Sequence, residues 1–201
     1  MKDRSAAWAM FLLCSLFPAS STHAQTKSQK NQMAVYDDRD GYEVLSVLLN
    51  RLSEVRKNDI IRIAPLTSAG EYVAEIKAHC AGIPEEFHAA SGDFDGKAKT
   101  RLRLTRGFSL TKNYELARGR AVNELVQAET REEAQKRIRS GTYHVAAVGF
   151  DDKRTRAIAF VEYICGSLCG ASIFYYLRKT EKGWEEAPEV GPKVQSCGRI
   201  Y

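Results

Sequence analysis

The stretch from Ala157 to Arg178 constrains the fold of this chain more than any other part of the sequence. Two apolar runs, AIAFVEYI and ASIFYYLR, flank the six residues CGSLCG. Runs of this length that are rich in β-branched and aromatic residues, and are joined by a short glycine-containing segment, are typical of a β-hairpin. The sequence therefore predicts two long, paired strands in the C-terminal half.

The tip of this hairpin contains two cysteines that can close it covalently. We expect Cys165 and Cys169 to stand opposite each other, with Gly166–Leu168 as a three-residue loop. A redox-active pair is the alternative, but such pairs use C-x-x-C at the start of a helix. The expected register also sets Glu162 opposite Ser172 and Phe160 opposite Phe174.

The first 24 residues have the features of a secretory signal peptide. Lys2 and Arg4 give a positive start, and an apolar run from Ala6 to Pro18 follows. Since this run is shorter than the roughly 20 residues that span a bilayer, cleavage after Ala24 is favoured over an N-terminal anchor helix. We therefore expect an exported protein, periplasmic or extracellular, with no transmembrane segment after cleavage.

Export determines how the cysteines are interpreted. Cleavage would remove Cys14 and leave four cysteines, an even number that suits an oxidising compartment. Closeness in the sequence favours the pair Cys165–Cys169, which leaves Cys80–Cys197. The second bridge would close a long loop and stabilise the fold by about 4–5 kcal/mol in the chain-entropy model. A zinc site is the alternative, but the spacing matches no common zinc pattern, and we expect neither a metal nor another cofactor.

Apolar spacing and turn residues predict the remaining elements. Helices are expected at 41–55 with Asp40 as N-cap, at 71–79, at 84–90, and at 122–139 with a Thr130–Glu133 capping box. Strands are expected at 59–65, 97–106, 113–117, 144–150 and 184–190, with a loop at 91–96. The fold class is therefore α+β, in which N-terminal helices pack on a mainly antiparallel, curved β-meander. Residues 25–33 are expected to form a disordered arm and residues 34–201 a single domain.

A basic run from Lys97 to Arg120 is the strongest charge asymmetry in the chain. It carries eight basic residues against one acidic residue, whereas the whole chain has a net charge of +5. One interpretation is a solvated strand face. The other is a contact with an anionic surface or an acidic protein, and no nucleic-acid motif accompanies the run. The candidate contact residues are Lys99, Arg101, Arg103 and Arg106.

Glu162 is the one charged residue inside an apolar strand. A buried carboxyl can act as a general acid or base, so a small hydrolase with a cleft between helices and sheet is one alternative. We favour pairing with an arginine near a sheet edge, because the sequence places no second acid or histidine beside it. His79, His88 and His144 lie on different elements, and Ser109–Lys112 matches S-x-x-K without that motif's partners.

Several motifs resemble a group of exported bacterial proteins with no assigned activity. In the C-terminal half they are Val148–Asp151, Cys165–Gly170 as C-G-x-L-C-G, Tyr175–Leu177 and Lys182–Trp184. Upstream, the similar segments are Tyr42–Leu49, Ile83–Phe87 and Tyr114–Leu116. Cys80 and Cys197 are additions to the pattern of this group, and Val190–Pro192 stands where the group has a tryptophan-containing strand. The resemblance implies no catalytic residue.

Taken together, these features favour an exported, non-enzymatic binding or envelope-associated domain of unknown ligand over the hydrolase. A structural partner of another envelope protein is a further alternative. The sequence carries no signal for the oligomeric state.

Mass mapping of the unreduced protein tests the cysteine framework. We expect an internal disulfide in the 157–178 peptide, seen as the mass of the lost hydrogens, and a cross-linked pair of peptides that contain Cys80 and Cys197. A cross-link from Cys80 to Cys165 or Cys169 would contradict this pairing.

Overall fold

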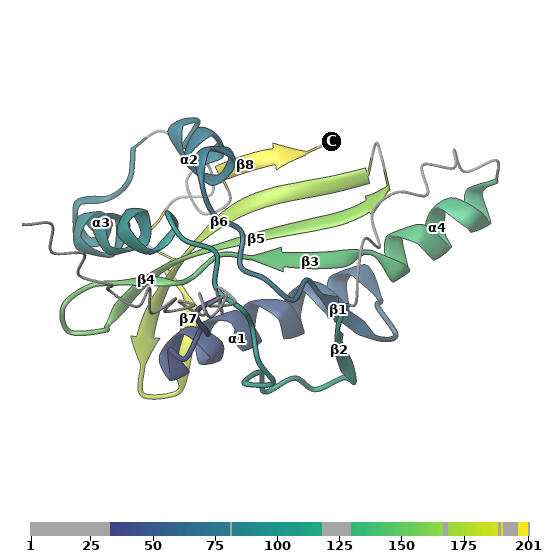
Figure 1. Cartoon of the computed structure of the whole chain (residues 1–201), viewed down its shortest axis with the longest axis horizontal. Helices are drawn as coiled ribbons and strands as arrows, with labels where there is room; N and C mark the ends of the chain where they lie inside the picture. The colour runs from purple at the N-terminus through teal and green to yellow at the C-terminus, as the bar shows by residue number, and fades with distance from the viewer. Residues whose placement is uncertain are drawn as a thin grey trace, which may run out of the picture. The chain divides into compact units, whose positions relative to one another are not determined.

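A long β-hairpin forms the centre of the sheet (Figure 1). In the computed structural model, which describes residues 33–80, 82–117, 130–166, 169–188, 190 and 197–200, β5 (Arg156–Gly166) pairs with β6 (Cys169–Thr180). The predicted register is confirmed along the strands, with Glu162 opposite Ser172 and Phe160 opposite Phe174. The predicted tip is wrong, because the register shifts after Ile164 and Gly166, rather than Cys165, pairs with Cys169.

The sheet is mixed rather than purely antiparallel. Its order is β2-β1-β3-β5-β6-β7, with β4 paired to β5 and β8 paired to β6. The C-terminal strands pair antiparallel, whereas β1 pairs in parallel with both β2 and β3. Long connections allow parallel pairing, which a tight hairpin cannot give. The bounds are β1 (Ile61–Ile63), β2 (Tyr114–Leu116), β3 (Thr142–Val145), β4 (Gly149–Phe150), β7 (Gly183–Glu186) and β8 (Cys197–Ile200). The α+β class is confirmed, and the predicted meander describes the C-terminal strands alone.

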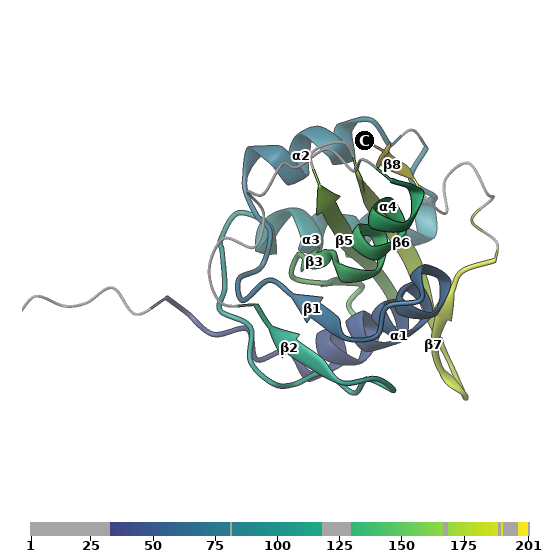
Figure 2. The ribbon, with the colours of Figure 1, turned by 90° about the vertical axis from the view of Figure 1, so that its right-hand side faces the viewer.

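Helices cover both faces of the sheet (Figure 2). On one face lies α1 (Arg39–Arg56), whose buried side chains share a core with alternate residues of β3, β5 and β6, among them Tyr143, Val161 and Tyr175. On the other lie α2 (Glu71–Ala78), the short 3-10 helix η1 (Glu85–Phe87) and α3 (His88–Lys97). Their core contains the intervening strand residues Ile158, Phe160, Phe174 and Tyr176. A strand buried on both faces loses the apolar–polar alternation, which explains the continuous apolar runs.

The two predicted N-terminal caps of helices have different outcomes. Asp38, not Asp40, is the N-cap, and its side chain accepts a hydrogen bond from the Gly41 amide at 3.1 Å. The Asp40 carboxylate is instead bonded to Arg154 at 2.5 Å. Burial alone would raise the pKa of Asp40, but Arg154 and Lys179 outweigh burial and lower it. At α4 (Arg131–Ser140) the predicted Thr130–Glu133 capping box is confirmed.

The loop predicted at 91–96 is wrong, because α3 continues through these residues to Lys97. Phe94 is buried in this helix and packs edge-on against Phe174, with ring centroids 5.4 Å apart. Burial of this aromatic ring outweighs the weak helix propensity of the neighbouring glycines.

The strand predicted at 97–106 is also wrong. After α3 the chain forms an extended connection that makes only isolated bridges, from Arg103 to Val35 and to Leu66. Its backbone bonds run to two neighbouring segments: the Arg103 amide donates to Ala34 O at 2.8 Å, and the Leu104 amide to Pro65 O at 2.9 Å. The alternation of leucine and arginine therefore reflects a connection held between two segments, with Leu104 buried.

Two further strand predictions are corrected in length. The expected strand at 144–150 is split into β3 and β4, and the expected strand at 184–190 ends at Glu186 in β7. The signal peptide, residues 25–32 of the predicted arm and residues 122–129 of the predicted fourth helix lie outside the described residues. None of the helices in the described part of the chain is long and apolar enough to cross a membrane.

Gly149 tests the packing of α3 on the sheet. A Cβ at Gly149 would lie 2.4 Å from the Ala90 carbonyl oxygen and 2.5 Å from the Phe94 amide nitrogen, both backbone atoms of α3. We expect Gly149→Ala to lower the free energy of unfolding by about 2–3 kcal/mol in urea titrations. Gly96→Ala is the matched control, because no neighbour lies within 4 Å of its Cβ; it should stabilise α3 by about 0.5–1 kcal/mol. Equal effects of the two changes would contradict this packing.

Candidate functional site

The four candidate contact residues of the basic run all lie on the extended connection after α3. Lys99, Arg101, Arg103 and Arg106 are exposed, and no ion pair joins any of them to another described residue. We call these four residues the basic connection. They are not presented by a strand face, as the sequence predicted, but by a segment anchored through its backbone.

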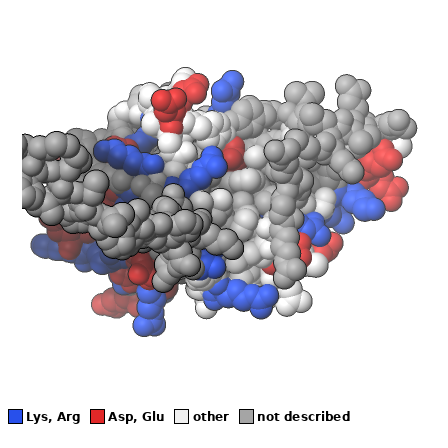
Figure 3. Space-filling model, in the orientation of Figure 1, with Lys and Arg blue, Asp and Glu red and all other residues white. Residues whose placement is uncertain are grey.

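The remaining basic residues of the run differ from these four. The Lys97 ammonium bonds to Asp93 at 2.7 Å and to the Val148 carbonyl at 3.1 Å, and Lys112 bonds to the Asn58 carbonyl at 3.0 Å. Both therefore hold the fold together, while Arg118 and Arg120 lie outside the described residues. On the face drawn in Figure 3, Lys and Arg side chains form separate groups rather than one continuous patch.

A second group of polar side chains crosses the middle of the sheet. The strand register pairs His144 on β3 with Glu162 on β5, Glu162 with Ser172 on β6, and Ser172 with Arg199 on β8. Directly paired residues start from the same face, roughly 5 Å apart. We call these four residues the polar row. It belongs to the face that α2 and α3 cover, because the neighbours of Glu162 on β5 enter the core beneath α1.

Glu162 is held by hydroxyl groups rather than by an arginine. Glu162 as a residue is 6% exposed, and its Oε1 atom accepts hydrogen bonds from the Tyr72 hydroxyl of α2 and from the Ser172 hydroxyl, the latter at 2.8 Å. No ion pair joins Glu162 to another described residue. The expected arginine partner near a sheet edge is therefore wrong, since β5 lies inside the sheet.

His144 stands on the other side of Glu162 and is largely buried. Its Nε2 atom is buried and has no hydrogen-bond partner, and no hydrogen bond or ion pair joins the imidazole to Glu162. Burial lowers the pKa of His144, while the nearby Glu162 carboxyl acts in the opposite direction. The ring is therefore neutral near pH 7, and one of its nitrogens is an acceptor.

The polar row does not form a nucleophile–base pair. Ser172 is fully buried and donates its hydroxyl to Glu162, whereas a catalytic serine donates to an imidazole. Three surface cavities of about 380, 430 and 490 Å³ are lined by described residues, and Glu162 lines none of them.

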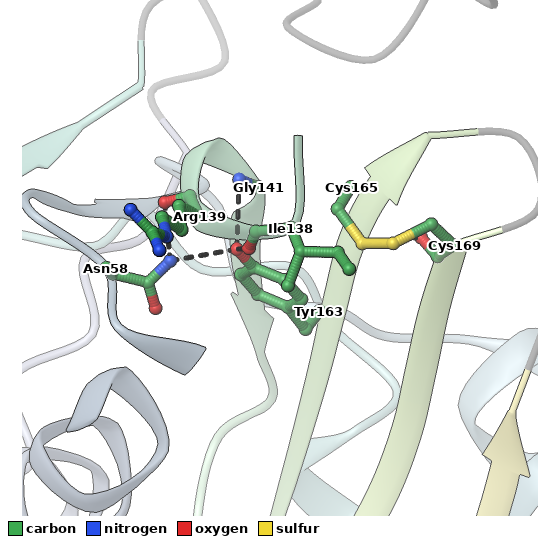
Figure 4. Close-up of a disulfide and its surroundings, with 7 residues drawn as sticks. All are labelled: Asn58, Ile138, Arg139, Gly141, Tyr163, Cys165 and Cys169. Carbon is green, nitrogen blue, oxygen red and sulfur yellow. Dashed lines mark hydrogen bonds between the residues drawn. A yellow bond between two sulfur atoms is a disulfide. The ribbon is translucent and has the colours of Figure 1, made fainter. Parts of the chain in front are cut away.

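The Cys165–Cys169 disulfide is formed, with the two Cα atoms 5.1 Å apart. Figure 4 shows it beside Tyr163, whose hydroxyl accepts hydrogen bonds from Asn58 and from the Gly141 amide, both at 2.9 Å, and donates to the Ile138 carbonyl. Burial raises the pKa of Tyr163, so its hydroxyl remains a donor. The disulfide therefore lies where the hairpin tip meets the end of α4, an arrangement that suits a structural staple.

Cys80 is disulfide-bonded as well. It follows α2, which packs beside β8, the strand that begins at Cys197. This arrangement suits the predicted Cys80–Cys197 pairing, which stays a prediction because the Cys197 side chain lies outside the described part.

Comparisons with known proteins leave the site to be interpreted from its own geometry. No family model matches the chain, and no curated protein or solved structure is significantly similar to it. The resemblance to exported bacterial proteins therefore stays a prediction.

The pH dependence of stability tests the environment of His144. Because the pKa of His144 is lowered by folding, the unfolded chain binds more protons below about pH 6.5, and stability falls as the pH falls. One such group contributes a slope of at most about 1.4 kcal/mol per pH unit. We expect His144→Phe to flatten the decline between pH 7 and 5 in urea titrations. The exposed His79, replaced by Gln, controls for loss of an imidazole, and an unchanged slope in His144→Phe would contradict the assignment.

Proposed function

We propose that this protein is an exported, non-enzymatic binding domain that contacts a negatively charged surface through the basic connection. The observation that carries the proposal is the exposure of Lys99, Arg101, Arg103 and Arg106 without an ion pair to any described residue. Elsewhere in the described chain many cations are paired, as Arg154 is with Asp40 and Arg178 with Glu185. Cations without nearby counter-charges leave a local positive potential.

The backbone of the basic connection is held in place, which reduces the entropy that binding would cost. The Thr67 amide donates to the Leu102 carbonyl, and the Leu102 amide donates to the Thr67 hydroxyl at 2.8 Å. Three residues further on, the Thr105 amide donates to the Tyr42 hydroxyl, also at 2.8 Å. The exposed side chains of Arg103, between these anchors, and of Arg101 and Arg106, directly beside them, can adapt to anions whose spacing is not fixed.

The same chemistry fits two sources of negative charge. Lysine and arginine bind phosphate, sulfate and carboxylate groups alike, whether these belong to lipid headgroups or to a surface polysaccharide. The spread of the cations over an extended segment favours such a repetitive surface over one acidic protein, which would need a complementary shape. A stoichiometric protein partner that co-purifies with the chain would instead support the structural-partner alternative.

Charge reversal tests the proposal. We expect Arg101→Glu with Arg103→Glu to weaken binding to vesicles that contain anionic lipid by at least about a hundredfold at low salt, since each basic residue near such a surface contributes about 1 kcal/mol. Wild-type binding should fall steeply with salt. Retention on a sulfated-polysaccharide resin, measured in parallel, distinguishes the two sources.

The control is Lys153→Glu with Lys182→Glu, which changes the net charge equally at exposed turns outside the basic connection. Circular dichroism shows whether each variant is folded. Equal losses in the two double variants, or no loss in the first, would contradict the proposal.

A further inference from the structure

A surface pocket of about 380 Å³ lies between the first turn of α2 and the last turn of α3. Its floor is apolar, because Val73 of α2, Phe94 of α3 and Ala98 line it and are themselves buried residues. Pockets for small molecules measure about 300–1,000 Å³, so this one has the size for a small ligand with an apolar group.

Polar contacts hold the two walls of the pocket together. The Lys77 ammonium of α2 donates to the Asp95 carboxylate and to the Ser91 hydroxyl of α3, both at 2.6 Å. Asp95 also lines the pocket, and Lys77 neutralises its charge. At the start of α2, the Gly70 amide donates to the Ala98 carbonyl at 2.8 Å. The walls are therefore in place before a ligand enters, which lowers the ordering cost of binding.

Two further charged residues line the pocket, one of each sign. Glu71 and Lys99 are both exposed, and no ion pair joins either of them to another described residue. They directly follow Gly70 and Ala98, whose backbones are hydrogen-bonded to each other, so the two side chains start from neighbouring points of the chain. The mouth of the pocket thus offers one negative and one positive charge beside an apolar floor.

We propose that this pocket binds a small zwitterion with an apolar side chain, namely a free α-amino acid of the leucine type. The ligand's ammonium bonds to the Glu71 carboxylate, and its carboxylate accepts from the Lys99 ammonium. Hydrogen bonds between charged groups are stronger than those between neutral ones. The apolar side chain of the ligand leaves water and packs against Val73 and Phe94, which supplies the hydrophobic part of the binding free energy.

Other classes of ligand match the pocket less completely. A simple anion is attracted by Lys99 but repelled by Glu71, and a simple cation meets the reverse. A neutral apolar molecule fills the floor and leaves both charges without a partner. A peptide moves its terminal charges apart by about 3.5 Å for each residue in an extended chain, whereas Glu71 and Lys99 start from neighbouring points. The combination of features therefore selects a single amino acid.

This inference goes beyond the proposed surface contact and does not rest on it. The two sites share Lys99, whereas Arg101 and Arg103, on which the vesicle experiment depends, do not line the pocket. If Arg101→Glu with Arg103→Glu abolishes vesicle binding and leucine does not bind, the proposed function stands and this inference fails. The reverse result separates them in the other direction.

NMR titration of the full chain with leucine tests the proposal. We expect saturable shifts of the backbone amides and methyl groups that line the pocket, with a dissociation constant on the order of 1 mM for a ligand of this size. Three matched compounds each lack one part of the ligand: N-acetyl-leucine lacks the ammonium, leucinamide lacks the carboxylate, and glycine lacks the side chain. Each should bind at least tenfold more weakly than leucine.

Charge-neutralising variants assign the two polar contacts. In Glu71→Gln the preference for leucine over N-acetyl-leucine should disappear, while the preference over leucinamide remains. In Lys99→Gln the preference over leucinamide should disappear, while that over N-acetyl-leucine remains. Both residues are exposed, so neither change removes a buried contact.

A third variant tests the apolar floor. Ala74→Phe places a ring into the pocket from an exposed position of α2, and we expect it to weaken leucine binding at least tenfold. Ala78→Phe, one turn later on the same helix, is the matched control, because Ala78 is exposed and does not line the pocket. It should leave leucine binding unchanged.

The absence of a saturable shift with leucine would overturn the proposal and leave Glu71 and Lys99 to pair with each other. Equal binding of leucine and glycine would overturn it too, as would preferences that both charge-neutralising variants retain. If Ala74→Phe fails to fold, the comparison of the four compounds on the wild-type chain still decides the question.

Discussion

The fold depends on burial of the β5–β6 hairpin from both sides. Successive residues from Ala157 to Phe160 are all fully buried, yet they enter two different cores. A hairpin with one solvent-exposed face would need a single layer of helices. This hairpin is apolar on both faces and needs α1 on one face and α2 with α3 on the other. The hydrophobic gain on both faces provides the rigidity that lets the same strands hold a buried carboxyl. Removal of either helical layer would expose half of the hairpin to water.

Features that depend on residues close together in the sequence could be predicted from the sequence. The hairpin register followed from the position of the cysteine–glycine segment, and the capping box of α4 followed from the Thr130–Glu133 spacing. The parallel pairing of β1 with β2 and β3 was not predictable, because it depends on long-range contacts between short strands. Residues Ser91–Gly96 show the same limit, since their turn-like composition is overruled by the contact of Phe94 with a strand 80 residues away in the sequence.

The candidate sites also differ in how much of each could be predicted from the sequence. The basic connection was found from its run of like charges, a feature that can be seen in the sequence without knowledge of the fold. Its assignment to a strand was wrong, because apolar and basic residues also alternate in an extended segment that is bonded to a neighbouring segment on each side. Glu162 stood out in an apolar run, but its partners Tyr72 and His144 come from elements whose register against β5 the sequence does not encode locally. His144 gave one signal that could have been used, namely a second ionisable residue inside an apolar strand.

The basic connection and Tyr72 share one support, although they serve different chemistry. The segment from Pro65 to Gly70 leads directly into α2, and it is bonded along the same connection that carries the arginines: Pro65 O accepts from Leu104, Thr67 bonds with Leu102, and the Gly70 amide donates to Ala98 O at 2.8 Å. Gly70 lies in the positive-φ region, at 88°, where a glycine lets the chain turn into the helix without strain. Tyr72 therefore lies in the first turn of a helix whose approach to the sheet is set by backbone hydrogen bonds to the basic connection. The position of the Tyr72 hydroxyl at Glu162 therefore depends on the hydrogen bonds between residues 65–70 and the basic connection as well as on its own hydrogen bond to Glu162.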